Sequence, residues 1–113
     1  MNTHARIVSD TELEKALDWL RDSAKDIGEA KREAVRCGHM VKHVKALAKM
    51  QFNTLSDAKA ETEALASQAY LDAIGADAAA AGEYEKMRAL REAAALKIET
   101  WRSEQANFRA MKI

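Results

Sequence analysis

An apolar residue stands at every seventh position through the first half of this chain. The repeat comprises Leu13, Leu20, Ile27, Ala34, Val41, Ala48 and Leu55. A strict period of seven keeps one narrow stripe of a helix against a partner helix, which is typical of a coiled-coil seam. Other apolar residues widen the stripe: Ala16, Leu17, Ala24, Ala30, Cys37 and Val44. The repeat predicts one long helix with a narrow packing face.

A second repeat of seven runs through the rest of the chain at another phase. It comprises Ala66, Ala73, Ala80, Met87, Ala94, Trp101 and Phe108. One flank adds Ala69, Ala76 and Leu90, and the other adds Tyr70, Tyr84 and Ile98. The chain contains no proline and four glycines, and alanine, leucine and charged residues dominate the rest, as in long helices. Both repeats predict an all-α fold.

Capping residues and turn residues set the expected boundaries. Two pairs have the spacing of a capping box at the first helix start: Ser9 with Glu12, and Thr11 with Glu14. Further on, Asn53 suits a helix end in the left-handed conformation, and Thr54 or Ser56 suits the start of the next helix.

We therefore predict one domain over residues 1–113. It has a loose arm at 1–8, a helix at 9–52, a turn at 53–56 and a second helix at 57–111. The sequence Gly75-Ala76-Asp77 resembles a helix stop followed by a cap, so a break near 75–77 is the alternative to one continuous second helix.

Charge is distributed in blocks that favour an antiparallel hairpin. Residues 31–49 hold six bases and one acid, whereas residues 57–85 hold one base and seven acids. Residues 1–30 hold seven acids and four bases, and residues 86–113 hold seven bases and three acids. Folding the chain about residue 54 sets each basic block beside an acidic one, and such pairing selects register and partner.

A single thin hairpin buries only one stripe of each helix, and this chain has few large side chains. We therefore predict a long coiled-coil-like hairpin that self-associates into a bundle or ring. The candidate interface residues between copies are Trp19, Leu20, Ile27, Val41, Met87, Trp101 and Phe108. Aromatic residues are favoured in interface cores, although packing at the open end of the hairpin would explain both tryptophans equally well.

Several classes of protein find no support in the sequence. There is no phosphate-binding glycine loop, no nucleophile motif and no paired-carboxylate signature, so we expect no enzyme activity and no cofactor. One cysteine, Cys37, excludes an internal disulfide framework and fits a reducing cytoplasm. No apolar run approaches the ~20 residues that span a bilayer, and the N-terminus lacks the apolar core of a signal peptide. We expect a soluble cytoplasmic protein.

Cys37, His39 and His43 form the pattern C-x-H-x-x-x-H. The two histidines share a helix face, but Cys37 belongs to the seam and no carboxylate lies one turn away to serve as a third ligand. We expect two solvent-facing histidines and no metal site.

The block from Lys31 to Lys49 is the main candidate for a partner-binding surface. Arg32, Arg36, His39 and His43 recur along one helical face, and Lys42, Lys45 and Lys49 along an adjacent one. A positive stripe can follow phosphates without reading sequence. With two bases near the C-terminus, the predicted nucleic-acid-binding residues are Arg32, Arg36, Lys42, Lys45, Lys49, Arg102 and Arg109. The alternative is that these bases pair with the acidic arm opposite.

Three stretches also carry a resemblance to a known group. They are Lys42-x-x-Lys45-Ala46-Leu47-Ala48-Lys49, the acidic Glu61-x-Glu63-Ala64 with Tyr70 after it, and Ile98-Glu99-x-Trp101-Arg102-x-x-x-Ala106-Asn107-x-Arg109. Over most of residues 10–110 the chain resembles small helical proteins that tailed phages encode near their recombination genes. Those proteins in turn resemble the UvsY-type recombination mediators.

The resemblance implies an oligomeric helical protein of the host cytoplasm that binds single-stranded DNA and helps to load a recombinase in place of a single-strand-binding protein. Lys42, Lys45 and Lys49 would contact DNA, with Arg102 and Arg109 as a second group. A protein-interaction module without DNA binding is the alternative: a scaffold, an adaptor or a phage inhibitor of a host complex. A metal- or ligand-binding bundle is a third.

Overall fold

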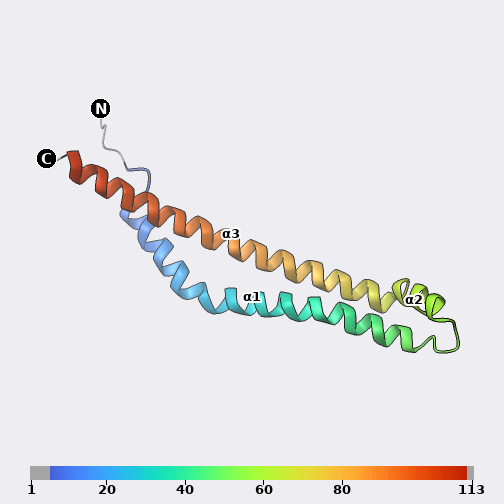
Figure 1. Cartoon of the computed structure of the whole chain (residues 1–113). Coiled ribbons are helices and arrows are strands. Elements are labelled where there is room, and N and C mark those ends of the chain that lie inside the picture. Colours follow the sequence, from blue (N-terminus) through green and yellow to red (C-terminus); the bar gives the residue numbers. More distant parts are fainter. Residues whose placement is uncertain (1–5, 112–113) are drawn as a thin grey trace. The chain divides into compact units, whose positions relative to one another are not determined.

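The computed structural model describes residues 6–111, and all regular structure among them is α-helical (Figure 1). Helix α1 spans Asp10–Met50, α2 spans Asp57–Leu65 and α3 spans Gln68–Met111. The predicted all-α class is confirmed. No helix in this part of the chain is long and apolar enough to cross a membrane.

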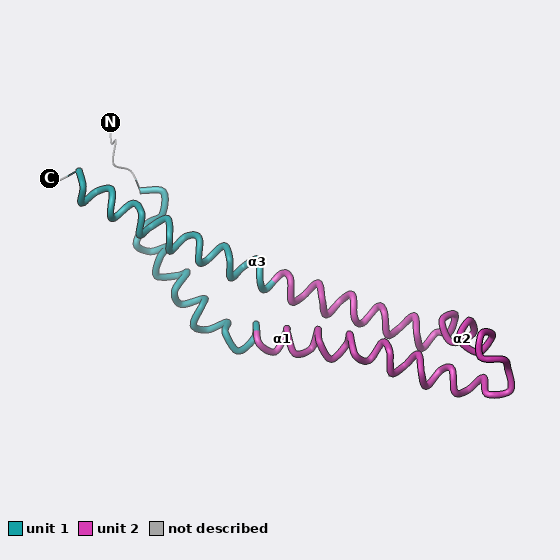
Figure 2. Tube along the Cα trace, viewed as in Figure 1, with its two compact units in different colours: residues 1–27, 87–113 teal, residues 28–86 magenta. Residues whose placement is uncertain are grey.

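The chain forms two compact units to which α1 and α3 both contribute (Figure 2). Unit 1 contains the described residues 6–27 and 87–111, and unit 2 contains residues 28–86. In each unit a segment of α1 lies antiparallel to a segment of α3, as the charge blocks predicted (Figure 2). That residues 1–113 make up a single domain stays a prediction.

The packing face of α1 follows the predicted repeat of seven. Its buried and half-buried residues recur at alternating intervals of three and four: Leu13, Ala16, Leu20, Ser23 and Ile27 in unit 1, and Ala30, Ala34, Cys37, Val41, Val44 and Ala48 in unit 2. Leu17 and Ala24 are exposed and do not belong to the seam. The buried seam position in this part of α1 is Ser23. A polar side chain is tolerated there because its hydroxyl donates a hydrogen bond to the carbonyl of Trp19.

On α3 the predicted seam residues from Ala73 to Phe108 are all buried or half-buried. Only one predicted flank joins them: Tyr70, Tyr84 and Ile98 are half-buried, whereas Ala69, Ala76 and Leu90 are exposed. The two ends of the predicted repeats are wrong. Leu55 lies in the turn and is 41% exposed, and Ala66 is exposed at a break between helices.

The start of α1 is capped by Ser9. Its hydroxyl accepts from the Glu12 amide at 3.1 Å, which confirms the first half of the predicted capping box. Residues 1–5 of the predicted loose arm lie outside the described residues. For Ile7 and Val8 that prediction is wrong, because their amides donate to the Glu104 carboxylate at 2.9 Å each and Val8 is only 4% exposed.

The predicted first helix is two residues too long, because α1 ends at Met50. Asn53 does not adopt the left-handed conformation, since no residue between 6 and 111 has a positive φ. The chain leaves the helix through a tightened turn instead, in which the Gln51 and Phe52 amides each donate three residues back. Ser56 then caps α2 by accepting from the Lys59 amide, as predicted.

The second helix is broken, but not near residues 75–77 as the alternative prediction placed it. Gly75 lies inside α3, and the break falls at Ala66–Ser67. The Ser67 hydroxyl donates to the Ala64 carbonyl at 2.6 Å and accepts from the Tyr70 amide at 3.2 Å. One side chain therefore closes α2 and caps α3, which makes the break favourable at this residue.

The buried apolar residues are mostly small: Val8, Ala16, Ile27, Cys37, Ala48, Ala60, Ala64 and Ala94. No large side chain among the described residues is fully buried. Several large apolar side chains are instead half or more exposed, including Leu71 at 56% and Leu96 at 67%. This sparse packing is what a single pair of helices provides, and the predicted self-association stays a prediction.

Candidate nucleic-acid interface

The basic block of α1 is divided between two directions in unit 2. Arg32, Arg36 and Lys42 are exposed, on the side of α1 away from the seam. Lys45 and Lys49 are instead directed at α2 and form ion pairs with it. The five residues of this block that were predicted to bind nucleic acid therefore do not form one surface.

We call the exposed set the outer basic strip: Arg32, Arg36, His39, Lys42 and His43. Arg32, Arg36, His39 and His43 follow one face of a helix over about three turns, and Lys42 lies on the adjacent face. Neither Arg32 nor Lys42 forms an ion pair with any residue between 6 and 111. Glu33, the one acid of this block, forms its ion pair with Arg36 and interacts with Arg32 only through the weaker attraction of charge.

Lys45 and Lys49 hold the start of α2 beside the end of α1. The Lys45 Nζ atom lies 2.7 Å from the Glu61 Oε1 atom, and the Lys49 Nζ atom lies 3.3 Å from the Asp57 Oδ1 atom. The ion pair lowers the pKa of Glu61 and raises the pKa of Lys45. The predicted alternative, that bases of this block pair with the acidic arm, therefore describes these two lysines.

Arg36 belongs to the outer strip but already binds a carboxylate. Its guanidinium donates to both oxygens of Glu33, from Nε at 3.0 Å and from Nη2 at 2.6 Å. This hydrogen bonding, with a further bond from the Cys37 thiol, lowers the pKa of Glu33 to about 2. Burial, followed by the contact with Glu33, raises the pKa of the Cys37 thiol, which favours an unreactive thiol.

The second predicted group lies on the C-terminal part of α3 in unit 1. Arg102 is exposed and forms an ion pair with Glu99 on its own helix, 3.1 Å apart. Arg109 is exposed in the last turn, where a cation suits the negative end of the helix dipole. The ion pair of Arg102 and the position of Arg109 at the end of α3 are therefore both explained by helix stability, without a DNA contact.

Cys37 is separated from His39 and His43 by the helix that carries all three. Cys37 is buried on the seam, whereas both histidines are exposed on the outer strip. Among residues 6–111, no group of three or more histidine, cysteine, aspartate or glutamate side chains is placed to hold a metal ion.

Six of the seven residues predicted for an interface between copies lie on the seams within the chain itself, and Trp19 stands one position before the seam residue Leu20. Ile27 is buried, and the other six are half-buried: Trp19, Leu20, Val41, Met87, Trp101 and Phe108. Their place in contacts between copies stays a prediction.

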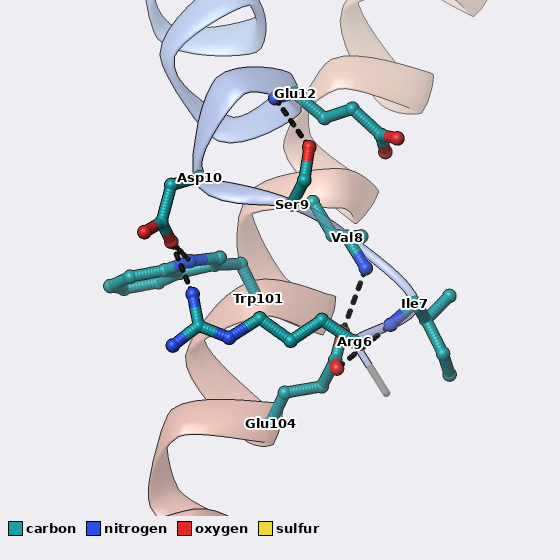
Figure 3. A network of polar contacts seen from close by, with 8 residues as sticks. All are labelled: Arg6, Ile7, Val8, Ser9, Asp10, Glu12, Trp101 and Glu104. Atoms are coloured by element: carbon teal, nitrogen blue, oxygen red, sulfur yellow. Dashed lines mark hydrogen bonds and ion pairs between the residues drawn. The ribbon is translucent and has the colours of Figure 1, made fainter. Parts of the chain in front are cut away.

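Trp101 belongs to a polar cluster that joins the start of α1 to the end of α3 in unit 1 (Figure 3). Its indole N–H donates to the Asp10 carboxylate at 2.9 Å, and Asp10 also pairs with Arg6. The Arg6 guanidinium lies over the Phe108 ring, 5.8 Å from its centroid. Glu104 completes the cluster by binding the backbone of Ile7 and Val8.

Sequence reasoning missed three residues with structural roles: Ser23 on the seam, Ser67 at the break and Glu104 in the cluster. Ser23 fills the one position that interrupts the alternating three and four spacing of apolar residues, so the spacing was a usable signal for it. Glu104 had none, because its partners are backbone amides almost one hundred residues away in the chain.

Comparisons with known protein families, with curated proteins and with solved structures found no match to this chain.

Proposed function

We propose that this chain is an oligomeric accessory protein of DNA recombination or replication, which binds single-stranded DNA without sequence preference and assists the loading of a recombinase. The observation that carries the proposal is the outer basic strip of unit 2. Arg32 and Lys42 are exposed there and form no ion pair among the described residues. Arg32 shares a face with Arg36 and two histidines, and Lys42 lies on the adjacent face.

Such a strip suits phosphates better than it suits a small substrate. Cations spaced along a helix follow a charged backbone through contacts that carry no sequence information. Self-association would repeat the strip and raise its avidity without new contacts, because each further engagement becomes intramolecular. The sparse core and the exposed large apolar side chains support self-association.

Fluorescence anisotropy of a labelled thymidine oligonucleotide tests the proposal. Neutralising two cations of the strip by Arg32→Gln with Lys42→Gln should weaken binding and flatten its salt dependence. The slope of log K against log salt should fall in magnitude by about 1.4, since each phosphate contact of a single strand contributes about 0.7.

The matched control is Lys59→Gln with Arg91→Gln, which removes the same charge at two exposed positions outside the strip. If both pairs of substitutions weakened binding equally, the strip would have no special role. If the unmodified protein bound no oligonucleotide even at low salt, the proposed function would be wrong.

A protein-interaction module is the second candidate, favoured by a shallow apolar hollow of about 410 Å³ in unit 2. Its apolar lining residues are Cys37, Met40, Val44, Ala69, Ala73 and Ala76, and the charged residues Arg36 and Asp72 also line it. Exposed Met40 and small alanines suit the apolar face of a helix from another protein. The test is binding of this chain to a recombinase or a single-strand-binding protein. Loss of that binding in the Met40→Lys variant, with binding kept in the Leu71→Lys variant, would support this candidate.

A further inference from the structure

Unit 1 contains a separate groove that the proposed strip does not use. It has a volume of about 270 Å³ and lies between α1 and α3. Its lining residues are Lys15, Ala16, Trp19, Leu90, Ala93, Ala94 and Lys97. Three alanines and one tryptophan produce an unusual surface, because small residues leave the large ring beside them uncovered.

The two tryptophans of unit 1 differ in what they bind. The Trp101 indole N–H is held by Asp10, whereas the Trp19 indole forms no hydrogen bond with any residue of the described part of the chain. Trp19 is half-buried, so part of its ring is open to the groove. A flat apolar face of this kind accepts another flat ring by stacking.

The charge of the groove selects among possible occupants. Its lining includes two lysines and no acid, and neither Lys15 nor Lys97 forms an ion pair with another residue of 6–111. A helix from a second copy would have to supply carboxylates beside its apolar face to match these cations. A nucleotide carries both parts at once, a flat base and a negative phosphate.

We propose that this groove binds one nucleotide of single-stranded DNA, with the base against Trp19 and its flanking phosphates at Lys15 and Lys97. The proposal rests on the proposed function and adds a second contact of another kind. The strip of unit 2 offers charge alone, whereas the groove of unit 1 offers charge and a stacking surface.

The test uses the full chain with Trp101→Phe, which leaves Trp19 as the sole tryptophan. The thymidine oligonucleotide should quench its indole fluorescence, with the same midpoint as the anisotropy of a labelled copy. Trp19→Leu should weaken binding by about 5- to 150-fold, since stacking of one base contributes about 1–3 kcal/mol.

Lysine substitutions separate the groove from a general effect of charge. Lys15→Glu and Lys97→Glu should each weaken binding more than Lys59→Glu, which changes net charge equally at an exposed site of unit 2. These surface changes also keep the test valid if Trp19→Leu disturbs the fold, which thermal unfolding would reveal.

The outcomes distinguish this proposal from the proposed function. The groove proposal is wrong if the oligonucleotide binds without changing Trp19 emission and if the Lys15→Glu and Lys97→Glu variants bind it as tightly as the Lys59→Glu variant does. That result would leave the proposed role of the strip intact. Binding that depends on the groove residues but not on Arg32 and Lys42 supports the groove and overturns the strip. Trp19 emission that changes with protein concentration and not with DNA assigns the groove to a second copy and overturns the proposal.

Discussion

In unit 1 single polar residues of α3 hold the N-terminal segment and the start of α1, whereas in unit 2 ion pairs between blocks of charge join α1 to α2. Glu104 and Asp10 each bind partners that no block of charge would indicate. Lys45 and Lys49 bind acids of α2 that belong to the block opposite. The difference shows that the distribution of charge along a sequence predicts ion pairs between whole charged blocks. It does not predict hydrogen bonds made by single residues such as Glu104 and Asp10.

The comparison also separates the energetics of the two units. A carboxylate that accepts from two backbone amides is costly to replace, because both donors lose a charged acceptor at once. Exposed ion pairs contribute little, since water already solvates both charges. Unit 1 should therefore be more sensitive to a single polar substitution than unit 2.

The largest effect is expected at Glu104. Glu104→Ala should lower the free energy of unfolding by about 1–3 kcal/mol, because the amides of Ile7 and Val8 lose their acceptor and Val8 loses its place in the core. Chemical denaturation measures the change, and hydrogen exchange should show faster exchange at both amides. The control is Glu99→Ala, which removes the same charge from α3 without touching the N-terminal segment. Equal losses for both variants would break the comparison.

A smaller effect is expected in unit 2 at Ser67. Ser67→Ala should cost about 1 kcal/mol of unfolding free energy, because the Ala64 carbonyl and the Tyr70 amide both lose a partner. Urea denaturation measures it against Ser103→Ala, an exposed serine inside α3. If Ser67→Ala were as harmless as Ser103→Ala, the cap would not explain the break between α2 and α3.

The smallest effect concerns pH and the exposed pair of Glu33 and Arg36. A carboxyl whose pKa in the folded chain is about 2, below its ordinary value of 4.5, adds stability above pH 4.5 that is lost as pH falls toward 2. With Arg36→Gln, the pKa of Glu33 should rise toward its ordinary value and this contribution should shrink. NMR titration of the Glu33 carboxyl carbon measures it, with Arg32→Gln as the control. An unchanged titration would show that Arg36 is not the cause.

The pattern of apolar residues was enough to predict much of the fold. Ile27 and Ala48 are buried where the repeat of seven placed them, and Cys37 is buried as one of the residues predicted to widen that stripe. The antiparallel pairing followed from charge, and Ser56 was recognisable as a cap. These predictions succeeded because each depends on spacing along one helix or on the sum of many like charges.

The candidate site was predicted less completely. Arg32 and Lys42 were predicted to bind nucleic acid together with Lys45 and Lys49, with pairing to the acidic arm as the alternative. The helical period does not reveal on which side of α1 the short helix α2 lies, so it could not separate the two pairs. The break at Ser67 was missed for a related reason. A glycine lowers the stability of a helix at any interior position, so the predicted break was placed at a glycine. A serine stabilises a break only where the backbone already leaves the helix, and the sequence does not show where that is.

The sequence by itself determined that this protein is all helical, which stripe of each long helix is buried, and that the charge blocks of its two arms are complementary. These properties arise from periodicity and composition, which act along the chain. Only the tertiary structure decided that Lys45 and Lys49 bind α2 while Arg32 and Lys42 stay exposed, and that Trp19 lines a groove while Trp101 binds Asp10. These contacts depend on which residues meet when two helices pack together. Spacing along one helix shows which face a side chain lies on, but not which residue of another helix it contacts.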